Sequence, residues 1–217
     1  MKKFILLANG KPPQKRLITY LQQKGYSELV CADGGANKAK NLNLVPDFII
    51  GDFDSVDKQT LKYFRDKSKI IKLSRQNDTD VEKCLKEMMN RNFSEAVLLG
   101  VTGDRLDHTF CNLGIVIKFF RQIKLKIIAE NSLLIPYSGN VELDTIPGET
   151  ISLYGFDTKT KISSQGLFYP LKNVSLPFGK KESTSNIAES DRVFLKIKGG
   201  IIFVIRDLAL LMKNNLI

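Results

Sequence analysis

The chain has 217 residues, and 33 Lys and Arg against 23 Asp and Glu give it a formal net charge of +10 at pH 7. This length suffices to bury a core as one large domain or two small ones, and no stretch approaches the roughly 20 apolar residues of a membrane helix. The three cysteines are far apart and form neither a metal-binding nor a disulfide pattern, which indicates buried thiols in a reducing cytoplasm.

The first 135 residues alternate short apolar runs with amphipathic segments. The run at 4–8 is too short for a secretory signal and is expected to be a buried strand, as are 29–32, 48–51, 69–73, 96–100 and 125–129. Pro12-Pro13 would open a first helix, and a later helix carries apolar residues three and four apart from 81 to 88. Continuous apolar strands alternating with helices predict a parallel sheet covered on both faces.

Beyond residue 137 the pattern changes to short apolar segments separated by Pro and Gly turns. Residues 195–198 alternate between apolar and polar, Gly199-Gly200 supplies a turn, and 201–205 is apolar, which predicts a β-hairpin. We therefore expect an α/β domain over residues 1–136 and an antiparallel β domain over residues 137–217.

Four short acidic clusters lie at predicted strand ends or helix starts: CADGG (31–35), GDFDS (51–55), NDTD (77–80) and TGDRLDH (102–108). Ligands of parallel α/β sheets bind outside the carboxyl ends of the strands, so we expect these clusters to meet at one edge of the sheet. Carboxylates suit a hard cation such as Mg²⁺, which usually arrives with phosphates. The sequence therefore predicts a magnesium–phosphate site.

Two of these clusters have both a functional and a structural interpretation. Asp52 and Asp54 are two residues apart, so in an extended chain both side chains face the same way and would repel each other without a cation. Alternatively, Asp54 or Ser55 caps the helix that follows. Thr79 and Glu82 form the pattern of a capping box, which would place Asp80 in the first helical turn for structural reasons alone.

The remaining clusters offer groups that suit a phosphate ligand. Arg105 carries forked donors for a phosphate. Asp107 also fits a helix cap, and His108, the only histidine, lies at a helix start, where a lone histidine is more often structural than catalytic. Gly34 and Gly35 allow the backbone to approach a ligand closely. Neither a dinucleotide fingerprint nor a Walker A motif is present.

Taken in order, these motifs resemble the thiamine pyrophosphokinase family. The resemblance rests on CADGGANK (31–38), PDFIIGDFDS (46–55), NDTDVEKCL (77–85), LLGVTGDRLDHTFCNL (98–113), GLFYPL (166–171) and STSN (183–186). It implies an ATP-binding catalytic α/β domain followed by a β-sandwich domain for thiamine binding and dimerisation. It also implies a cytoplasmic homodimer with active sites at the subunit interface, which uses Mg²⁺ and transfers pyrophosphate from ATP to the hydroxyl of thiamine, giving thiamine diphosphate and AMP.

The resemblance also implies roles for individual residues of this chain. The catalytic and metal-binding residues would be Asp52, Asp54 and Asp80; the nucleotide-binding residues Asp33, Gly34, Gly35, Thr79, Arg105, Asp107 and His108; and the thiamine-binding residues Ser185 and Asn186. The proton of the thiamine hydroxyl would go to Asp80 or Asp54.

The chain departs from the family pattern at three points. Asn77 stands where the family often has Asp, Asp104 replaces a common Gly, and the chain has no Trp, so any stacking on the thiamine rings must use Phe or Tyr.

Other functions fit parts of the pattern. One is a pyrophosphokinase that acts on another hydroxymethyl heterocycle, such as a pterin. A phosphatase with Asp52 as nucleophile would carry its acidic pair on the first strand, whereas here the pair follows the third. A nucleic-acid-binding module would need a basic face with exposed aromatic residues, whereas the clustered features here are acidic.

Overall fold

The computed structural model describes residues 1–74, 77–103 and 105–217. The chain forms two compact units, Met1–Glu130 and Asn131–Ile217. The expected boundary between residues 136 and 137 falls inside strand β7 (Ser132–Asp144), which belongs entirely to the second unit.

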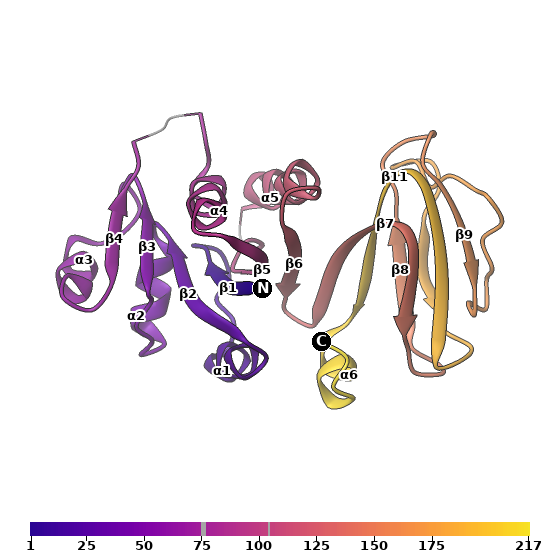
Figure 1. Cartoon of the computed structure of the whole chain (residues 1–217), viewed down its shortest axis with the longest axis horizontal. Coiled ribbons are helices and arrows are strands. Elements are labelled where there is room, and N and C mark those ends of the chain that lie inside the picture. The colour runs from indigo at the N-terminus through magenta and orange to yellow at the C-terminus, as the bar shows by residue number, and fades with distance from the viewer. Residues whose placement is uncertain (75–76, 104) are drawn as a thin grey trace. The chain divides into compact units, whose positions relative to one another are not determined.

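The first unit is a parallel sheet with helices on both faces. Its elements are β1 (Lys2–Leu7), α1 (Lys15–Gln23), β2 (Tyr26–Ala32), α2 (Gly35–Asn41), β3 (Phe48–Gly51), α3 (Lys58–Phe64), β4 (Lys69–Lys72), α4 (Asp80–Asn90), β5 (Phe93–Leu99), α5 (Leu106–Phe119) and β6 (Lys124–Ala129). The strand order is β6-β5-β1-β2-β3-β4, and every pair is parallel. Figure 1 shows α4 and α5 on one face and α1 and α2 on the other. This confirms the predicted parallel sheet, whose central strands are apolar because both faces are covered.

The order of the strands reverses at β1, which lies between β2 and β5. The segments that follow β1 and β5 continue to pair through backbone hydrogen bonds. Gly10 N–H donates to Gly100 C=O at 2.7 Å, and Lys11 N–H donates to Thr102 C=O at 3.0 Å. Glycine is required here, because a Cβ on Gly10 would lie 2.4 Å from the Thr102 oxygen. In open α/β sheets such a reversal point is where ligands bind.

The helix starts differ in part from expectation. α1 begins at Lys15 rather than at Pro12-Pro13, because Gln14 is still extended with ψ of 143°. The capping box of α4 is confirmed: Thr79 Oγ1 accepts from Glu82 N–H, and Glu82 reaches back to Thr79 N–H. The N-cap of α3 is Asp57, so the alternative that Asp54 or Ser55 caps this helix is wrong.

The second unit is antiparallel. It contains β7, β8 (Thr150–Tyr154), β9 (Lys161–Gln165), β10 (Ser183–Ile187), β11 (Arg192–Asp207) and α6 (Leu208–Lys213). β11 pairs with β7, β8 and β9, and β10 pairs with β8. The strands enclose their own apolar core, which includes Ile151, Leu153, Ile162, Val193 and Leu195. The antiparallel pairing is as predicted, and the sandwich arrangement stays a prediction.

The predicted hairpin at 195–205 is wrong, because these residues form one strand. β11 runs through Gly199-Gly200 with a register shift between Ile197 and Ile202, and β7 pairs with both parts. Gly199 has φ of 85°, and a Cβ on Gly200 would lie 2.0 Å from Thr160 Oγ1. The two glycines therefore bend the strand instead of reversing it. Among the described helices, none has the length and apolar character needed to cross a membrane.

Candidate functional site

A cavity of about 650 Å³ opens at the carboxyl ends of β1, β2, β3 and β5, beside the starts of α4 and α5. Of the predicted site residues, it is lined by Asp33, Gly34, Asp52, Thr79, Asp80, Arg105, Asp107 and His108. Gly35 has a different role, because a Cβ there would lie 2.1 Å from Leu7 C=O, so it permits close packing of α2 on β1. A larger groove of about 1020 Å³ lies in the second unit, but none of the predicted site residues lines it.

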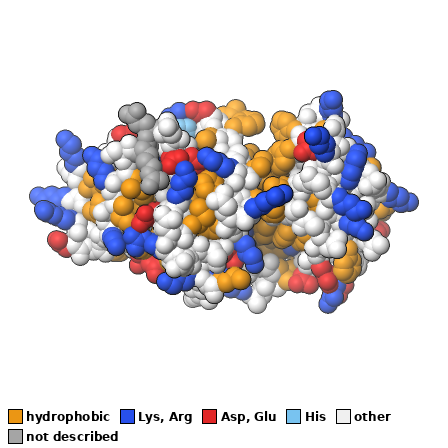
Figure 2. Space-filling view, turned by 45° about the horizontal axis from the view of Figure 1, so that its top comes forward, with side chains coloured by type: hydrophobic (Ala, Val, Ile, Leu, Met, Phe, Trp, Pro, Cys, Tyr) orange, Lys and Arg blue, Asp and Glu red, His pale blue; other side chains and the backbone are white. Residues whose placement is uncertain are grey.

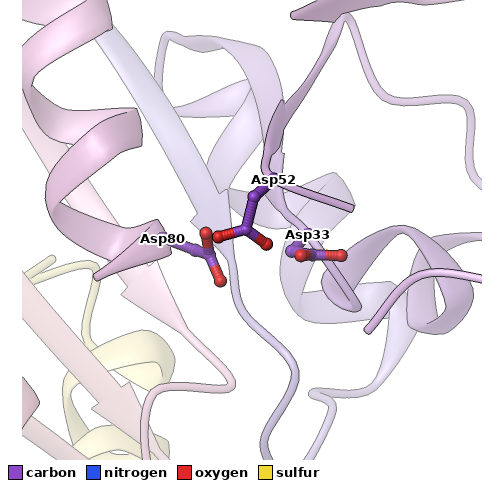
Figure 3. Close-up of side chains that lie close together, drawn as sticks. All are labelled: Asp33, Asp52 and Asp80. Carbon is purple, nitrogen blue, oxygen red and sulfur yellow. The ribbon is translucent and has the colours of Figure 1, made fainter. Parts of the chain in front are cut away.

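Three carboxylates converge in the first cavity, as Figure 3 shows. Asp33 follows β2, Asp52 follows β3 and Asp80 begins α4, and one oxygen from each lies within 4.8 Å of the others. Asp33 is 1% exposed; its Oδ2 accepts from Phe53 N–H at 3.1 Å, while Oδ1 has no hydrogen-bond partner among the described residues. A buried carboxylate oxygen without a donor, beside two further carboxylates, fits a hard divalent cation such as Mg²⁺.

Asp54 lies outside this cluster of three. Phe53 has φ of 70°, so the expectation of an extended backbone between Asp52 and Asp54 is wrong. Asp54 is exposed and accepts from Ser55 Oγ at 2.7 Å. Asp33, distant in sequence, completes the group instead, and metal binding by Asp54 stays a prediction.

Lys83 is the site residue that the sequence reasoning missed. Its side chain is 2% exposed, and its Nζ donates to Asp52 Oδ2 at 2.7 Å and to Asp80 Oδ1 at 2.9 Å. The available signal was its position three residues after Asp80, which puts both on one side of α4. One helix therefore supplies both a carboxylate and its counter-charge.

The pKa values of the carboxylates differ according to their surroundings. Burial, reinforced by the nearby Asp80 carboxylate, raises the pKa of Asp33 to about 6. Burial also raises the pKa of Asp80, in spite of its hydrogen bond from Lys83. The hydrogen bond from Lys83 lowers the pKa of Asp52. Carboxylates held this close repel one another, which favours a cation in their midst.

The start of α5 carries a second pair of opposite charges. Arg105 Nε and Nη2 donate to Asp107 Oδ1 and Oδ2 at 3.2 and 2.5 Å, and both side chains are exposed. The hydrogen bond from Arg105 lowers the pKa of Asp107 to about 2. Figure 2 shows acidic and basic side chains side by side near the histidine. Asp104, the departure from the family pattern, lies outside the described residues.

The two residues predicted to bind thiamine lie in the second unit, on β10. Asn186 is 1% exposed; its Oδ1 accepts from Tyr169 N–H at 3.0 Å and its Nδ2 donates to Tyr169 C=O at 2.8 Å. Ser185 is exposed, has φ of 52°, and its N–H donates to Ser152 Oγ at 3.0 Å. Asn186 therefore fixes the loop of Tyr169, and Ser185 is the one open to a ligand.

Comparison with known proteins gives matches in both units. Residues 21–129 match the family model for the thiamin pyrophosphokinase catalytic domain, and residues 138–202 match that for its vitamin B1 binding domain. Thiamin pyrophosphokinase 1 of Caenorhabditis elegans is 34% identical over an alignment of 191 residues, and the match covers 81% of this chain and 77% of the relative. Thiamine pyrophosphokinase 1 of Oryza sativa is 28% identical over 206 residues, with the same two coverages.

Solved structures share the fold. The crystal structure of thiamine pyrophosphokinase from Bacillus subtilis superposes with a TM-score of 0.81 at 21% identity, covering 95% of this chain and 99% of that one. The yeast enzyme gives a TM-score of 0.77 at 21% identity, covering 95% and 86%. With both family models matched in order and a relative at 34% identity, the chain belongs to the thiamin pyrophosphokinase family.

Proposed function

We propose that this protein transfers pyrophosphate from ATP to the hydroxyl of thiamine and releases AMP and thiamine diphosphate. The observation that carries the proposal is the cluster of Asp33, Asp52 and Asp80, two of which bind Lys83, placed where the strand order of the sheet reverses. Such an arrangement suits a metal-bound polyphosphate. The matches to the catalytic and vitamin B1 binding models support thiamine as the second substrate.

The reaction is an in-line displacement at the β-phosphorus of ATP, with AMP as the leaving group. Catalysis of this kind depends mainly on positioning and charge neutralisation. Asp33, Asp52 and Asp80 would hold Mg²⁺, which supplies charge neutralisation at the phosphates when it is bound. Lys83 and Arg105 would offset the charge that develops on the phosphate oxygens.

One carboxylate of the site accepts the proton of the thiamine hydroxyl. Asp80 is one candidate, because it lies in the cavity beside the other two carboxylates. Asp54 remains the alternative acceptor. Thr79 contributes to the site by capping the start of α4, since its hydroxyl accepts from Glu82 N–H.

The thiamine side of the site is proposed to use the loop that Asn186 holds. Phe168 and Tyr169 are 56% and 62% exposed, and their rings meet edge to face at 4.8 Å. Aromatic rings of this kind attract a cationic heterocycle such as the thiazolium of thiamine. Ser185 would donate to the substrate. We further propose a β-sandwich for the second unit and a cytoplasmic homodimer with active sites at the subunit interface, as the family resemblance implies.

The direct test is to incubate the purified protein with Mg²⁺, ATP and thiamine and to quantify the products by chromatography. AMP and thiamine diphosphate are expected in equal amounts, and no AMP when a hydroxymethylpterin replaces thiamine. ADP with thiamine monophosphate would contradict pyrophosphoryl transfer.

A further inference from the structure

Lys83 lies against two of the three carboxylates of the cluster, Asp52 and Asp80. Its ammonium contacts one oxygen of Asp52 and one of Asp80, and among the described residues these are its hydrogen-bond partners. At 2% exposure the side chain is confined to the inner side of α4. Lys83 therefore competes directly with any cation that binds the same two carboxylates.

A free divalent ion would have to enter against this ammonium. It would take over carboxylate oxygens that now stabilise Lys83, leaving a buried charge with fewer partners and a like charge beside it. Both effects oppose binding of the metal alone, although the cluster of three carboxylates is otherwise well suited to it.

A nucleotide changes this balance because it brings phosphate oxygens into the cavity that Lys83 lines. The ammonium then gains new anionic partners as it gives up carboxylate oxygens. Metal and nucleotide binding are thereby coupled, and the coupling acts equally in both directions.

We propose that Lys83 makes metal binding depend on the nucleotide: its ammonium holds Asp52 and Asp80 together until phosphate oxygens replace them. The site then selects the metal–nucleotide complex over the free metal. Lys83 acts on the metal through the two carboxylates, and on the nucleotide through its own contact with the phosphate oxygens. The inference rests on the proposed function, because it requires a metal at Asp52 and Asp80.

The test measures binding of Mn²⁺, used as a spectroscopic probe for Mg²⁺, by electron paramagnetic resonance. Lys83→Met is expected to bind free Mn²⁺ about tenfold more tightly than the wild type. The same variant is expected to bind the Mn²⁺ complex of α,β-methylene-ATP, which cannot release AMP, more weakly. A general structural defect would weaken both, so changes of opposite sign identify the proposed role.

Lys86→Met is the matched control, because Lys86 lies on the same helix and pairs with Asp78 instead. It should change neither affinity more than about twofold. Lys83→Gln, which keeps a donor but loses the charge, replaces Lys83→Met if that variant does not fold. The inference is overturned if the Lys83 variant binds free Mn²⁺ no more tightly than the wild type does. If the wild type binds no Mn²⁺ even with the nucleotide analogue, the proposed metal site itself is wrong and the inference with it.

Discussion

The carboxamide of Asn186 hydrogen-bonds to both backbone groups of Tyr169, accepting from N–H at 3.0 Å and donating to C=O at 2.8 Å. A side chain here replaces the partner strand that would otherwise pair with this loop. Because Asn186 is 1% exposed while Tyr169 is 62% exposed, Asn186 influences a ligand through the loop it holds.

Asn186→Ala is therefore expected to raise the KM for thiamine and to leave the KM for ATP unchanged. It should also lower the free energy of unfolding by about 1–2 kcal/mol, since two partly buried backbone groups lose their partner. Steady-state kinetics and thermal unfolding check both effects. Tyr169→Ala separates them: it should raise the thiamine KM with little loss of stability. An unchanged thiamine KM in Asn186→Ala would exclude this loop from the substrate site.

Asp33 should make stability depend on pH. Its pKa is raised to about 6 by burial and by Asp80, against about 4 in an unfolded chain. The folded state therefore holds the proton more tightly, so the contribution of Asp33 to stability is fully present below about pH 4 and is lost as the pH rises through about 6. Above that pH the ionised side chain costs up to about 3 kcal/mol when no metal is present.

Asp33→Asn removes this dependence and suits the backbone, because Asn tolerates the φ of 41° at this position. In the presence of a chelator the variant should melt above the wild type at pH 8, and this advantage should disappear at pH 4.5. Added Mg²⁺ at pH 8 should stabilise the wild type more than the variant. A difference in melting temperature that does not change with pH would be inconsistent with a raised pKa.

The carboxylates that follow β3 should differ in how much kcat falls when each is replaced by Asn. Asp52→Asn is expected to reduce kcat at least ~100-fold, since it removes a proposed metal ligand and a partner of Lys83. Asp54→Asn tests the prediction that this exposed residue also binds the metal. A similar reduction in kcat would show that Asp54 joins the site when the substrates bind. Asp57→Asn, at an N-cap without a side-chain hydrogen bond, is the control and should be near normal. Full activity in Asp52→Asn would refute the metal site.

The parallel sheet was predictable because strands that are buried on both faces are continuous apolar runs in the sequence. The bend of β11 was not, because Gly-Gly between apolar runs looks the same whether the strand turns back or continues. The close approach of Thr160 to Gly200, a tertiary contact, decides it. A tertiary contact is also involved in the site. The backbone N–H of Phe53 donates to Asp33, twenty residues earlier, and local sequence does not reveal this bond.

Lys83 shows a second kind of limit. A lysine three residues after an aspartate in a helix indicates a solvated ion pair as readily as a buried one, and only the fold brings Asp52 to its ammonium. The clustering of carboxylates at strand ends was predicted correctly because it follows from the direction of parallel strands.

Gly10 should be intolerant of a side chain. A Cβ there would lie 2.4 Å from Thr102 C=O and 2.5 Å from Gly100 C=O, and both are backbone atoms of the cavity wall. Gly10→Ala is expected to cost about 1–3 kcal/mol of stability and to weaken ATP binding. Gly114→Ala in α5, where a Cβ meets nothing within 4 Å, should instead stabilise by roughly 0.5–1 kcal/mol. Thermal unfolding and nucleotide titration compare the two glycine variants. Equal melting temperatures would contradict the close approach of Gly10 to the carbonyls of Gly100 and Thr102.

The buried ion pair of the second unit should be a major determinant of its stability. Arg206 donates to Glu149 through Nε at 2.6 Å and Nη2 at 2.8 Å, and also to Asp144 C=O at 2.7 Å. The Glu149 side chain is 0% exposed, so Arg206→Met leaves a carboxylate without its counter-charge and should cost about 3–5 kcal/mol. Hydrogen exchange of β8 and β11 in the full chain measures the loss within this unit.

Arg192→Met is the control, because its pair with Glu142 is exposed on both sides and should contribute less than about 1 kcal/mol. Replacing Glu149 with Leu in the Arg206→Met background should restore part of the protection, since the stranded charge is then removed and two apolar side chains pack in its place. If the double variant exchanges as fast as Arg206→Met alone, the loss comes from the packing of the arginine rather than from an unpaired carboxylate.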